Sequence, residues 1–388
     1  MASMSGTLGF QYGVHGNAYY YGDGSTYPTP MHSFIGEWSK FTKERTHVYF
    51  SYDSPSLLTG WRLTLSSLYM IDPLAYFYGF NGAATHYSDS LSDAHHFALH
   101  RRFFVGNVNL QRNMPHHLRL VGGFSFSHYK TGDYDEGEYG GTAANSLYHQ
   151  YVQQGLIEEA EADGGNVFEA RAGLVYDTRN TEAAPDHGTL LELFLDGAIT
   201  EPGFNYLRLC AYWSNYINLP LNIIPAGDPV LAWRLAYIGK LAGEVPFYMQ
   251  QTVPMLVSRA VLSEGVGSAK TIRGLYENRI LADGVMWGNF ELRVKLVKFS
   301  LFKQFFYIAV NPFFDACRIL QPYRPELHAA FLGVEDIDDA AEQLTTAAGL
   351  GIKLAWNENF IVGIEVAHCF NPLMGDNLWF DLGINYAF

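Results

Sequence analysis

The stretch "LWFDLGINYAF", residues 378–388, alternates apolar side chains with polar or small ones. Successive side chains of a strand point to opposite faces, so Asp381 and Asn385 fall on one face and the apolar positions on the other. The apolar face consists of Leu378, Phe380, Leu382, Ile384, Tyr386 and Phe388. The stretch therefore predicts a β-strand with one apolar face that runs to the last residue.

The same period of two recurs along the chain. "NFELRVKL" (289–296), "GLGIKLAW" (349–356) and "FIVGIEVAHCF" (360–370) each set charged residues against an apolar face. A soluble sandwich also alternates, but these strands are long, often about 10–14 residues, as tilted membrane-spanning strands are. Their polar face also mixes charged residues with Gly and Ala, as a crowded wet lumen would. We therefore expect an all-β fold, an antiparallel transmembrane β-barrel that forms a single domain over residues 1–388.

About sixteen strands can be placed. Short connections such as "TKE", "NMPH" and "NEN" contrast with the long stretches 131–164, 242–283 and 319–343, a pattern typical of short periplasmic turns and longer outer loops. An even number places both termini on the periplasmic side. The segment 75–86 is included because the long loop after residue 130 has to face outward. The predicted strands are 7–20, 32–42, 45–54, 59–71, 75–86, 96–110, 116–130, 165–178, 188–200, 204–218, 229–241, 284–297, 304–318, 344–356, 359–370 and 377–388.

Composition excludes several classes of function. Aromatic residues reach 15%, and charged residues only 16%, which suits a pleated surface better than helices. The net charge of -14 argues against nucleic acid as a partner, because phosphate binding needs a basic face. No run of about 18 apolar residues predicts a transmembrane helix. Cys210, Cys317 and Cys369 lie in separate predicted strands, so we expect packing thiols rather than disulfides or metal ligands.

Catalytic and metal-binding patterns are also missing from the sequence. The pairs His95–His96 and His116–His117 are adjacent residues, and adjacent side chains in a strand point apart rather than converge on a metal. No Gly-x-Ser-x-Gly elbow occurs, and no Ser and His are expected to converge. We therefore expect no enzyme activity, no metal and no cofactor.

The run "SAKTIRGLYENRI", residues 268–280, carries long polar side chains around Arg273–Gly274. It resembles the Arg-Gly-aromatic loop motif of the BamA/TamA outer-membrane barrel superfamily, with Tyr276 one position later than the usual aromatic. "GLVYDTRNTEAAPDHGTLLELFLDGA" (173–198), "NFELR" and "NPFFDAC" resemble strand motifs of the same superfamily. The resemblance covers about residues 165–388, and the terminal Phe388 also fits the family's carboxy-terminal signature.

The resemblance implies that the outer loop at about 242–283 folds back into the lumen. Arg273 would then pair with Glu291 and Asp315, which the alternation places on inward faces. A guanidinium can bind a carboxylate with two parallel hydrogen bonds, a geometry that Lys does not match. Gly274 would allow a tight bend of the backbone. We interpret the Arg-Gly pair as a structural latch rather than a catalytic group.

In the relatives, the first and last strands meet at a weak seam that assists the passage of a client strand or lipid. Here the seam would join 7–20 to 377–388, and Gly9, Gly13 and Gly16 should weaken pairing in the first strand. The resemblance thus implies a bacterial (Gram-negative) outer-membrane protein with a role in protein or lipid insertion or translocation. Its partners would be outer-membrane lipids, and client outer-membrane proteins or periplasmic proteins.

Two alternatives stay open. The family usually carries periplasmic polypeptide-transport-associated domains before the barrel, whereas only about six residues precede the first predicted strand. The sequence therefore fits a stand-alone barrel or a barrel cut from a longer chain. Without those domains, a passive pore or a scaffold that binds partner proteins is the alternative function. Inward charges such as Arg62, Glu169, Arg171, Glu192 and Arg208 could line a pore or form a mutually paired network in the lumen.

Overall fold

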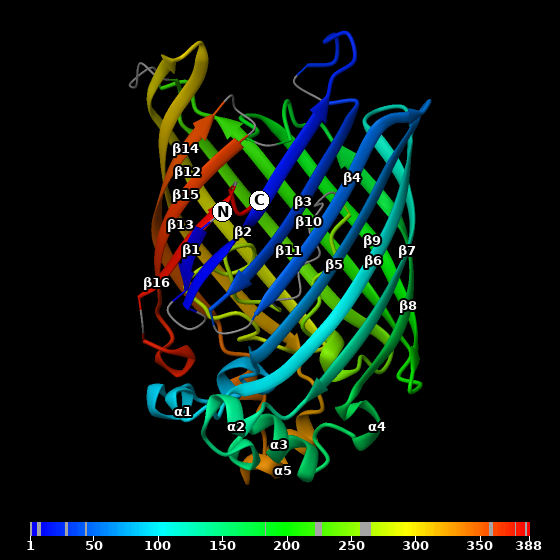
Figure 1. Cartoon of the computed structure of the whole chain (residues 1–388), viewed down its shortest axis with the longest axis vertical. Coiled ribbons are helices and arrows are strands. Elements are labelled where there is room, and N and C mark those ends of the chain that lie inside the picture. The colour runs from blue at the N-terminus through cyan, green and yellow to red at the C-terminus, as the bar shows by residue number, and fades with distance from the viewer. Residues whose placement is uncertain are drawn as a thin grey trace.

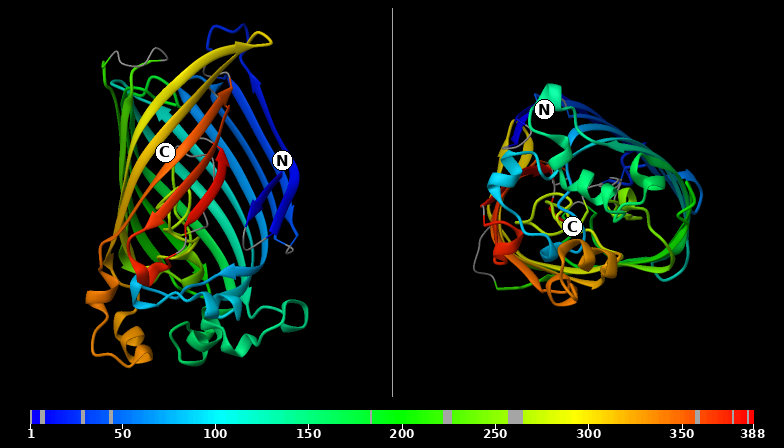
Figure 2. Two further views of the ribbon diagram at one scale, coloured as in Figure 1. Left: turned by 90° about the vertical axis from the view of Figure 1, so that its left-hand side faces the viewer. Right: turned by 90° about the horizontal axis from the view of Figure 1, so that it is seen from below.

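In the part of the chain that the structure describes, the sheet contains sixteen strands in chain order, with every neighbouring pair antiparallel. The structure is a computed structural model, which describes residues 2–5, 9–27, 30–42, 45–182, 184–221, 227–256, 265–356, 360–376, 378–384 and 386–388. The sheet curls round on itself into a barrel, so that β1 and β16 form its two edges and face each other (Figures 1 and 2). The predicted fold class, an all-β antiparallel barrel, is confirmed.

The strands are four to eighteen residues long. They are β1 (Ala2–Ser5), β2 (Gly9–Tyr20), β3 (His32–Phe41), β4 (Thr46–Leu58), β5 (Trp61–Tyr76), β6 (Ala98–Asn113), β7 (Leu118–Gly132), β8 (Gly164–Asp177), β9 (Gly188–Glu201), β10 (Tyr206–Asn218), β11 (Val230–Gly243), β12 (Gly284–Leu301), β13 (Gln304–Gln321), β14 (Thr345–Trp356), β15 (Phe360–Cys369) and β16 (Trp379–Ile384).

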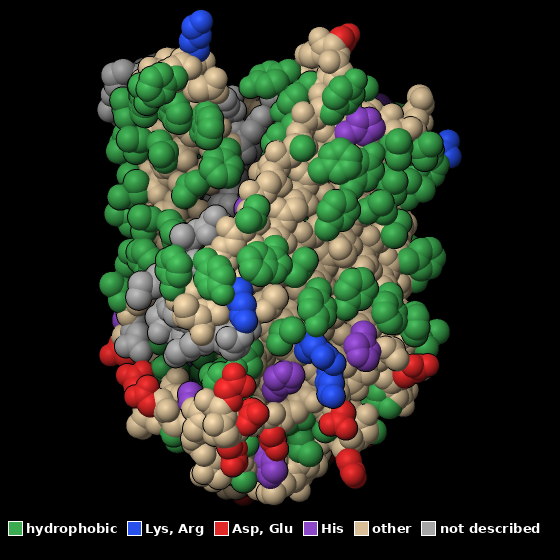
Figure 3. All heavy atoms as spheres, in the orientation of Figure 1, with side chains coloured by type: hydrophobic (Ala, Val, Ile, Leu, Met, Phe, Trp, Pro, Cys, Tyr) green, Lys and Arg blue, Asp and Glu red, His purple; other side chains and the backbone are tan. Residues whose placement is uncertain are grey.

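In the wall of the barrel, apolar side chains lie on the outside and charged side chains on the inside, the reverse of a soluble protein. On β14, Ile352 is 54% exposed on the outside, whereas the next residue, Lys353, is 2% exposed on the inside. Glu365 of β15 is likewise only 3% exposed. Green apolar side chains cover the outer wall in Figure 3. An apolar exterior around a charged interior is the arrangement expected of strands that cross a lipid bilayer.

The two ends of the barrel differ. At one end, here called the short-turn end, hairpins join the strands. The other end, the long-loop end, carries the α-helices of the described residues, at the bottom of Figure 1. None of the helices in the described ranges is both long and apolar enough to span a membrane. The helices are α1 (Asp89–Asp93), α2 (Glu136–Tyr139), α3 (Leu147–Gln153), α4 (Glu159–Ala162), α5 (Pro325–Leu332) and α6 (Asp338–Ala341), with short 3-10 turns η1 (Gly82–Ala84), η2 (Ala143–Asn145), η3 (Phe247–Met249) and η4 (Pro372–Met374).

The predicted strand 75–86 is wrong. β5 continues to Tyr76, and the chain then turns into the interior, where Phe77 and Phe80 are fully buried. Gly79 and Asn81 both have positive φ, at 80° and 61°, which breaks the extended conformation. Aromatic residues at close spacing imitate a strand in the sequence, but here they form the core of a loop.

A short strand that the sequence analysis missed restores the number sixteen. β1 pairs with β2 over Gly9–Tyr12, so the strand at the N-terminal edge is β1 and not the predicted 7–20. Removing one strand at 75–86 and adding one at the start reverses the direction of every strand between them. The connection between β3 and β4, predicted as a periplasmic turn, therefore lies at the long-loop end, and the connection 21–31 lies at the other.

The C-terminus departs from the predicted strand. β16 ends at Ile384, and Tyr386 and Ala387 are buried. The ring of Phe388 lies 6.2 Å from that of Tyr216 and 5.0 Å from the guanidinium carbon of Arg234, which is also buried. Phe388 thus lies inside the barrel, not on the lipid face as predicted. A cation–π contact with a buried guanidinium offers the aromatic ring an alternative to lipid.

Candidate functional site

The connection between β11 and β12 runs through the interior of the barrel, where Figure 1 shows it in yellow-green. Within the described ranges 244–256 and 265–283, η3 buries Phe247, Tyr248 and Met249 completely. An isolated antiparallel bridge between Val266 and Ile280 then closes the base of a hairpin. We call residues 265–283 the inner hairpin. Its tip carries the Arg-Gly pair into the lumen.

Arg273 is the centre of a buried charge cluster on the wall. Its Nε and Nη2 donate to the two carboxylate oxygens of Asp315, at 2.9 and 2.8 Å, and its backbone N–H donates to the same group at 3.0 Å. Nη1 donates to Glu291 and, at 3.4 Å, to Glu365. The guanidinium carbon also stands 3.5 Å from the ring centroid of Phe313. Strands β12, β13 and β15 therefore hold one side chain by paired, charge-assisted hydrogen bonds.

The residues next to Arg273 fit it against the wall. Gly274 has φ 91°, and a Cβ there would stand 3.1 Å from the Cβ of Ala347, so the tight approach favours glycine. Leu275, directly after the Arg-Gly pair, is buried. Tyr276 turns toward the mouth and stacks on Tyr78, with ring centroids 5.8 Å apart and planes at 29°. The structure thus brings four of the predicted latch residues to the wall and sends Tyr276 to the loops.

Arg279 is a buried arginine that the sequence analysis did not single out. Its guanidinium donates to four carbonyl oxygens from two other loops, at 2.7 to 3.3 Å. The acceptors belong to Gly82, Thr85, Leu373 and Met374. Every residue has a backbone carbonyl, so the sequence does not show which carbonyls accept hydrogen bonds from Arg279. The alternation could have found Glu365, because it places that residue on the inward face.

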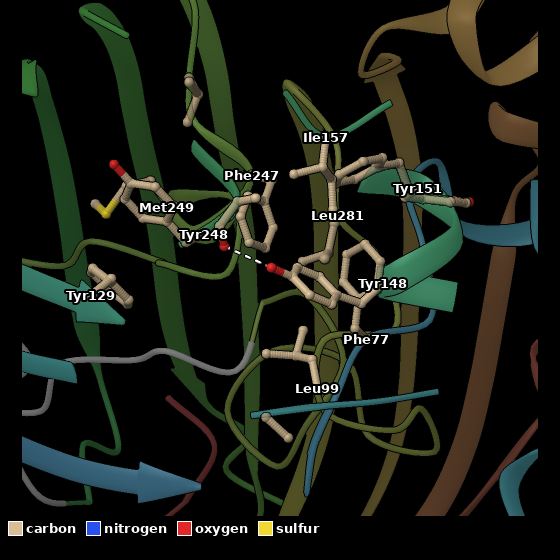
Figure 4. Close-up of a cluster of buried hydrophobic side chains, with 14 of the residues drawn as sticks. Phe77, Leu99, Tyr129, Tyr148, Tyr151, Ile157, Phe247, Tyr248, Met249 and Leu281 are labelled. Carbon is tan, nitrogen blue, oxygen red and sulfur yellow. Dashed lines mark hydrogen bonds between the residues drawn. The ribbon is translucent and has the colours of Figure 1, made fainter. Parts of the chain in front are cut away.

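The long-loop end is closed by an aromatic cluster. Figure 4 shows Tyr148 and Tyr151 of α3 beside Phe77 and Phe247, with Leu281 of the inner hairpin among them. The edge-to-face contact of Phe77 with Tyr151 has a centroid distance of 5.6 Å. The helices lie across the mouth when the barrel is viewed from below (Figure 2, right). Such packing of large rings around the return limb of the hairpin stabilises the closed mouth.

His328 of α5 belongs to the same mouth and is fully buried. The Asn81 side chain accepts from the backbone N–H of Tyr323 at 2.6 Å, so its amide nitrogen is the atom that donates to His328 Nδ1 at 3.0 Å. The Tyr151 hydroxyl lies 2.9 Å from Nε2. Burial lowers the pKa of His328 to about 4, so the ring is neutral at pH 7.

At the seam, the predicted glycines divide into two groups. Gly9 pairs with Ser5 of β1, whereas Gly13 and Gly16 lie beyond the last β1 pair, Ala2 with Tyr12. A Cβ on Gly13 would collide with the carbonyl oxygen of Trp38, so close approach of β3 requires glycine there. In the described part of the chain, β16 pairs only with β15 and β1 only with β2.

The C-terminal segment ties the seam to the inner hairpin. Lys270 Nζ donates to the carbonyl of Tyr386 at 2.8 Å, and Arg293 Nη2 donates to the main-chain oxygen of Phe388 at 2.8 Å. Arg293 Nε also donates to Glu291, a partner of Arg273. The predicted seam residue Phe388 is therefore connected to the latch rather than to β1.

No protein-family model matches the sequence, and no curated protein matches it. Several solved structures share the fold, including a BamA and a CdiB barrel. BamA from Haemophilus ducreyi lacking POTRA domains 1-3 is 16% identical, with a TM-score of 0.57 over 98% of this chain and 67% of that one. CdiB from Acinetobacter baumannii is 12% identical, with a TM-score of 0.51 over 99% of this chain and 58% of that one. At these identities the likeness shows the fold alone, and the predicted resemblance to BamA-type barrels is confirmed at that level.

Proposed function

We propose that this chain is an outer-membrane barrel of a Gram-negative bacterium that assists the insertion or translocation of a protein or lipid at the seam between β1 and β16. The supporting observation is the weakness of the two sheet edges. Over the described residues, β1 has four residues and β16 has six, whereas β12 and β13 have eighteen each. Short edges have few backbone hydrogen bonds to lose, so this seam should open at the lowest cost.

Because the lumen is filled, the seam is favoured over the lumen as the route that a client protein or lipid would take. The inner hairpin and its charge cluster occupy the interior, and the helices cross the mouth. BamA and CdiB are among the chains with a similar fold, which favours a role at the outer membrane. The proposal assigns no catalytic chemistry to the chain. A passive pore would need the latch to open, and a scaffold role would leave the weak edges without a purpose.

The test is a disulfide lock at the seam. Cysteines are introduced over Ala2–Ser5 and over Trp379–Leu382, and pairs that cross-link under mild oxidation are kept. The protein is reconstituted in liposomes, and the folding rate of an eight-stranded outer-membrane barrel diluted from urea is measured. The unlocked protein should speed folding several-fold, and the lock should abolish that gain until dithiothreitol restores it. The native Cys210, Cys317 and Cys369 are buried and should not interfere.

A matched control lock joins two strands that are already paired. Ile352 of β14 and Ile364 of β15 face each other in register, so the pair Ile352→Cys with Ile364→Cys should cross-link without changing the rate. Equal acceleration with the seam locked and unlocked, or none in either state, would contradict the proposal.

A further inference from the structure

The hairpin between β12 and β13 extends beyond its neighbours at the short-turn end. The last pair between β11 and β12 is Val230 with Arg293, yet β12 continues to Leu301. Over the described residues, the edge of 296–301 that faces β11 has no strand partner. Figure 1 shows this hairpin rising at the upper left of the barrel. We call Val294–Phe306 the outer hairpin.

The tip of the outer hairpin presents an aromatic side chain in an unfavourable conformation. Phe302 and Lys303 have φ of 51° and 62°, the left-handed values that two-residue hairpin turns require and that Asn-Gly supplies most easily. Bulky residues rarely adopt this conformation. Phe302 is nevertheless 89% exposed. Retaining Phe at a strained position with its ring outside the protein indicates that the ring contacts something other than this chain.

An apolar strip joins the tip to the lipid-facing wall. The ring of Phe299 stacks on Phe306 at 5.4 Å with planes at 12°, and Phe306 stacks on Trp356 at 6.0 Å with planes at 17°. Leu301 is exposed beside them. Trp356 ends the apolar face of β14, whose other members are Leu350, Ile352 and Leu354. The strip is therefore continuous with the surface that meets the bilayer.

The same hairpin is basic in a chain of net charge -14. Lys303 is exposed in the turn and Lys298 is exposed on β12 opposite Tyr307, and no Asp or Glu occurs between Lys295 and Phe306. Lysine side chains can lay their apolar stems along lipid while the ammonium group reaches the headgroups. Anionic phosphate would complement this charge.

Backbone geometry sets the depth of the hairpin. Backbone N–H and C=O groups without a strand partner are costly to place in hydrocarbon, so the edge of 296–301 that faces β11 is expected at a depth that water reaches. A lysine-bearing edge with a register shift between Lys295 and Val297 is also protected against the addition of a foreign strand. Both features favour a lipid headgroup region over a polypeptide partner.

We propose that the outer hairpin is a membrane anchor. Phe302 inserts at the boundary of headgroups and acyl chains in the leaflet at the short-turn end, and Lys298 and Lys303 bind lipid phosphates there. The inference requires only that the barrel wall is embedded in a bilayer, so it stands or falls separately from the proposed function at the seam. Aromatic and basic residues commonly anchor membrane proteins at this depth.

The test places a polarity-sensitive fluorophore on Phe302→Cys in the full chain, reconstituted in nanodiscs of phosphatidylcholine with or without phosphatidylglycerol. The buried native thiols leave the new cysteine as the reactive one. Emission should shift to the blue, and lipids brominated near the headgroup should quench it at least threefold more than at Pro115→Cys. Pro115 is an exposed residue in the β6–β7 turn at the same end of the barrel. Emission and quenching equal to those at Pro115 would overturn the proposal.

Two further variants keep the result interpretable. A label on Ser300→Cys, which leaves Phe302 in place, should be quenched to an intermediate degree. Lys298→Gln with Lys303→Gln should remove any additional quenching in phosphatidylglycerol, while the heat-dependent gel mobility of the folded barrel stays unchanged. Solvent-like emission at both label positions in a folded barrel would show that the hairpin stands in water.

Discussion

Two arginines six positions apart in the inner hairpin are held in opposite ways. Arg273 and Arg279 are both 0% exposed. Arg273 binds three carboxylates on the strands β12, β13 and β15. Arg279 binds four carbonyl oxygens on the loops near η1 and η4. The first contact fixes the tip of the hairpin to the wall, and the second fixes its return limb to the mouth.

The difference explains how the lumen can stay filled while the mouth of the barrel opens and closes. A buried guanidinium matched by carboxylates is costly to separate, because each partner is left as an uncompensated charge. A guanidinium that binds carbonyls leaves only neutral groups behind when it withdraws. We therefore infer that the wall contact is the permanent part of the latch and that the mouth is the part that can open.

The largest effect is expected from Arg273→Ala. Asp315 loses the guanidinium that binds both of its oxygens, whereas Glu291 keeps Arg293 and Glu365 keeps Lys353. The free energy of unfolding should fall by roughly 3–5 kcal/mol, the usual cost of breaking a buried pair from one side. Urea unfolding in detergent measures the loss, and planar-bilayer recordings should show a larger conductance than the wild type.

Two variants sharpen this prediction. Arg273→Lys keeps the charge but cannot bind Asp315 with two parallel hydrogen bonds, so its stability should fall between the wild type and Arg273→Ala. Arg273→Ala with Asp315→Asn removes charge on both sides and should recover part of the loss. A wild type that already conducts as freely as Arg273→Ala would refute the plugged lumen.

Arg279→Ala should have a smaller effect on stability, about 2–3 kcal/mol, because four carbonyls lose a donor but no buried charge is left unpaired. Hydrogen exchange should become faster near Gly82 and Met374, while exchange along β13 stays unchanged. The conductance should rise less than in Arg273→Ala. Faster exchange throughout the barrel wall would contradict the division between wall and mouth.

The smallest effect concerns the pH dependence of the mouth. The pKa of His328 is lowered in the closed mouth to about 4, whereas an exposed His has a pKa of about 6.5, so protons bind the open mouth first. The contribution of His328 to closure is therefore complete above pH 6.5 and is lost as the pH falls toward 4. Between pH 7 and pH 5 the free energy that favours the closed mouth over the open mouth should fall by about 1–2 kcal/mol.

Hydrogen exchange of α3, corrected for the intrinsic pH effect, measures this loss, because Tyr151 of α3 contacts His328 directly. His328→Gln should remove the pH dependence. If the wild type and His328→Gln respond to acid to the same extent, another group controls the mouth.

Much of the wall could be predicted from the sequence, because alternation reports burial directly. Lys353 opposite Ile352 and Glu365 opposite Ile364 already placed the charges inside. The same rule failed at residues 75–86, where Phe77 and Phe80 are buried by loops rather than by a strand. It failed again at Phe388, whose apolar character suits lipid and a guanidinium equally well. A four-residue strand such as β1 carries too little pattern to be recognised.

The site divides in a similar way. Glu291 and Asp315 could be named because the alternation places them on inward faces, and the family resemblance linked Arg273 of the loop to them. Arg279 could not, because its acceptors are main-chain carbonyls brought together from residues 82–85 and 373–374. His328 could not either, because its neighbours Asn81 and Tyr151 come from two other loops.

The sequence by itself determined that this chain forms a barrel with apolar residues outside and ionised residues inside, because a period of two is a local property of each strand. Only the tertiary structure decided which way the first strands run, where the last three residues lie and what holds the mouth shut. Those features depend on contacts between segments far apart in the chain, and side-chain alternation carries no information about which segments meet.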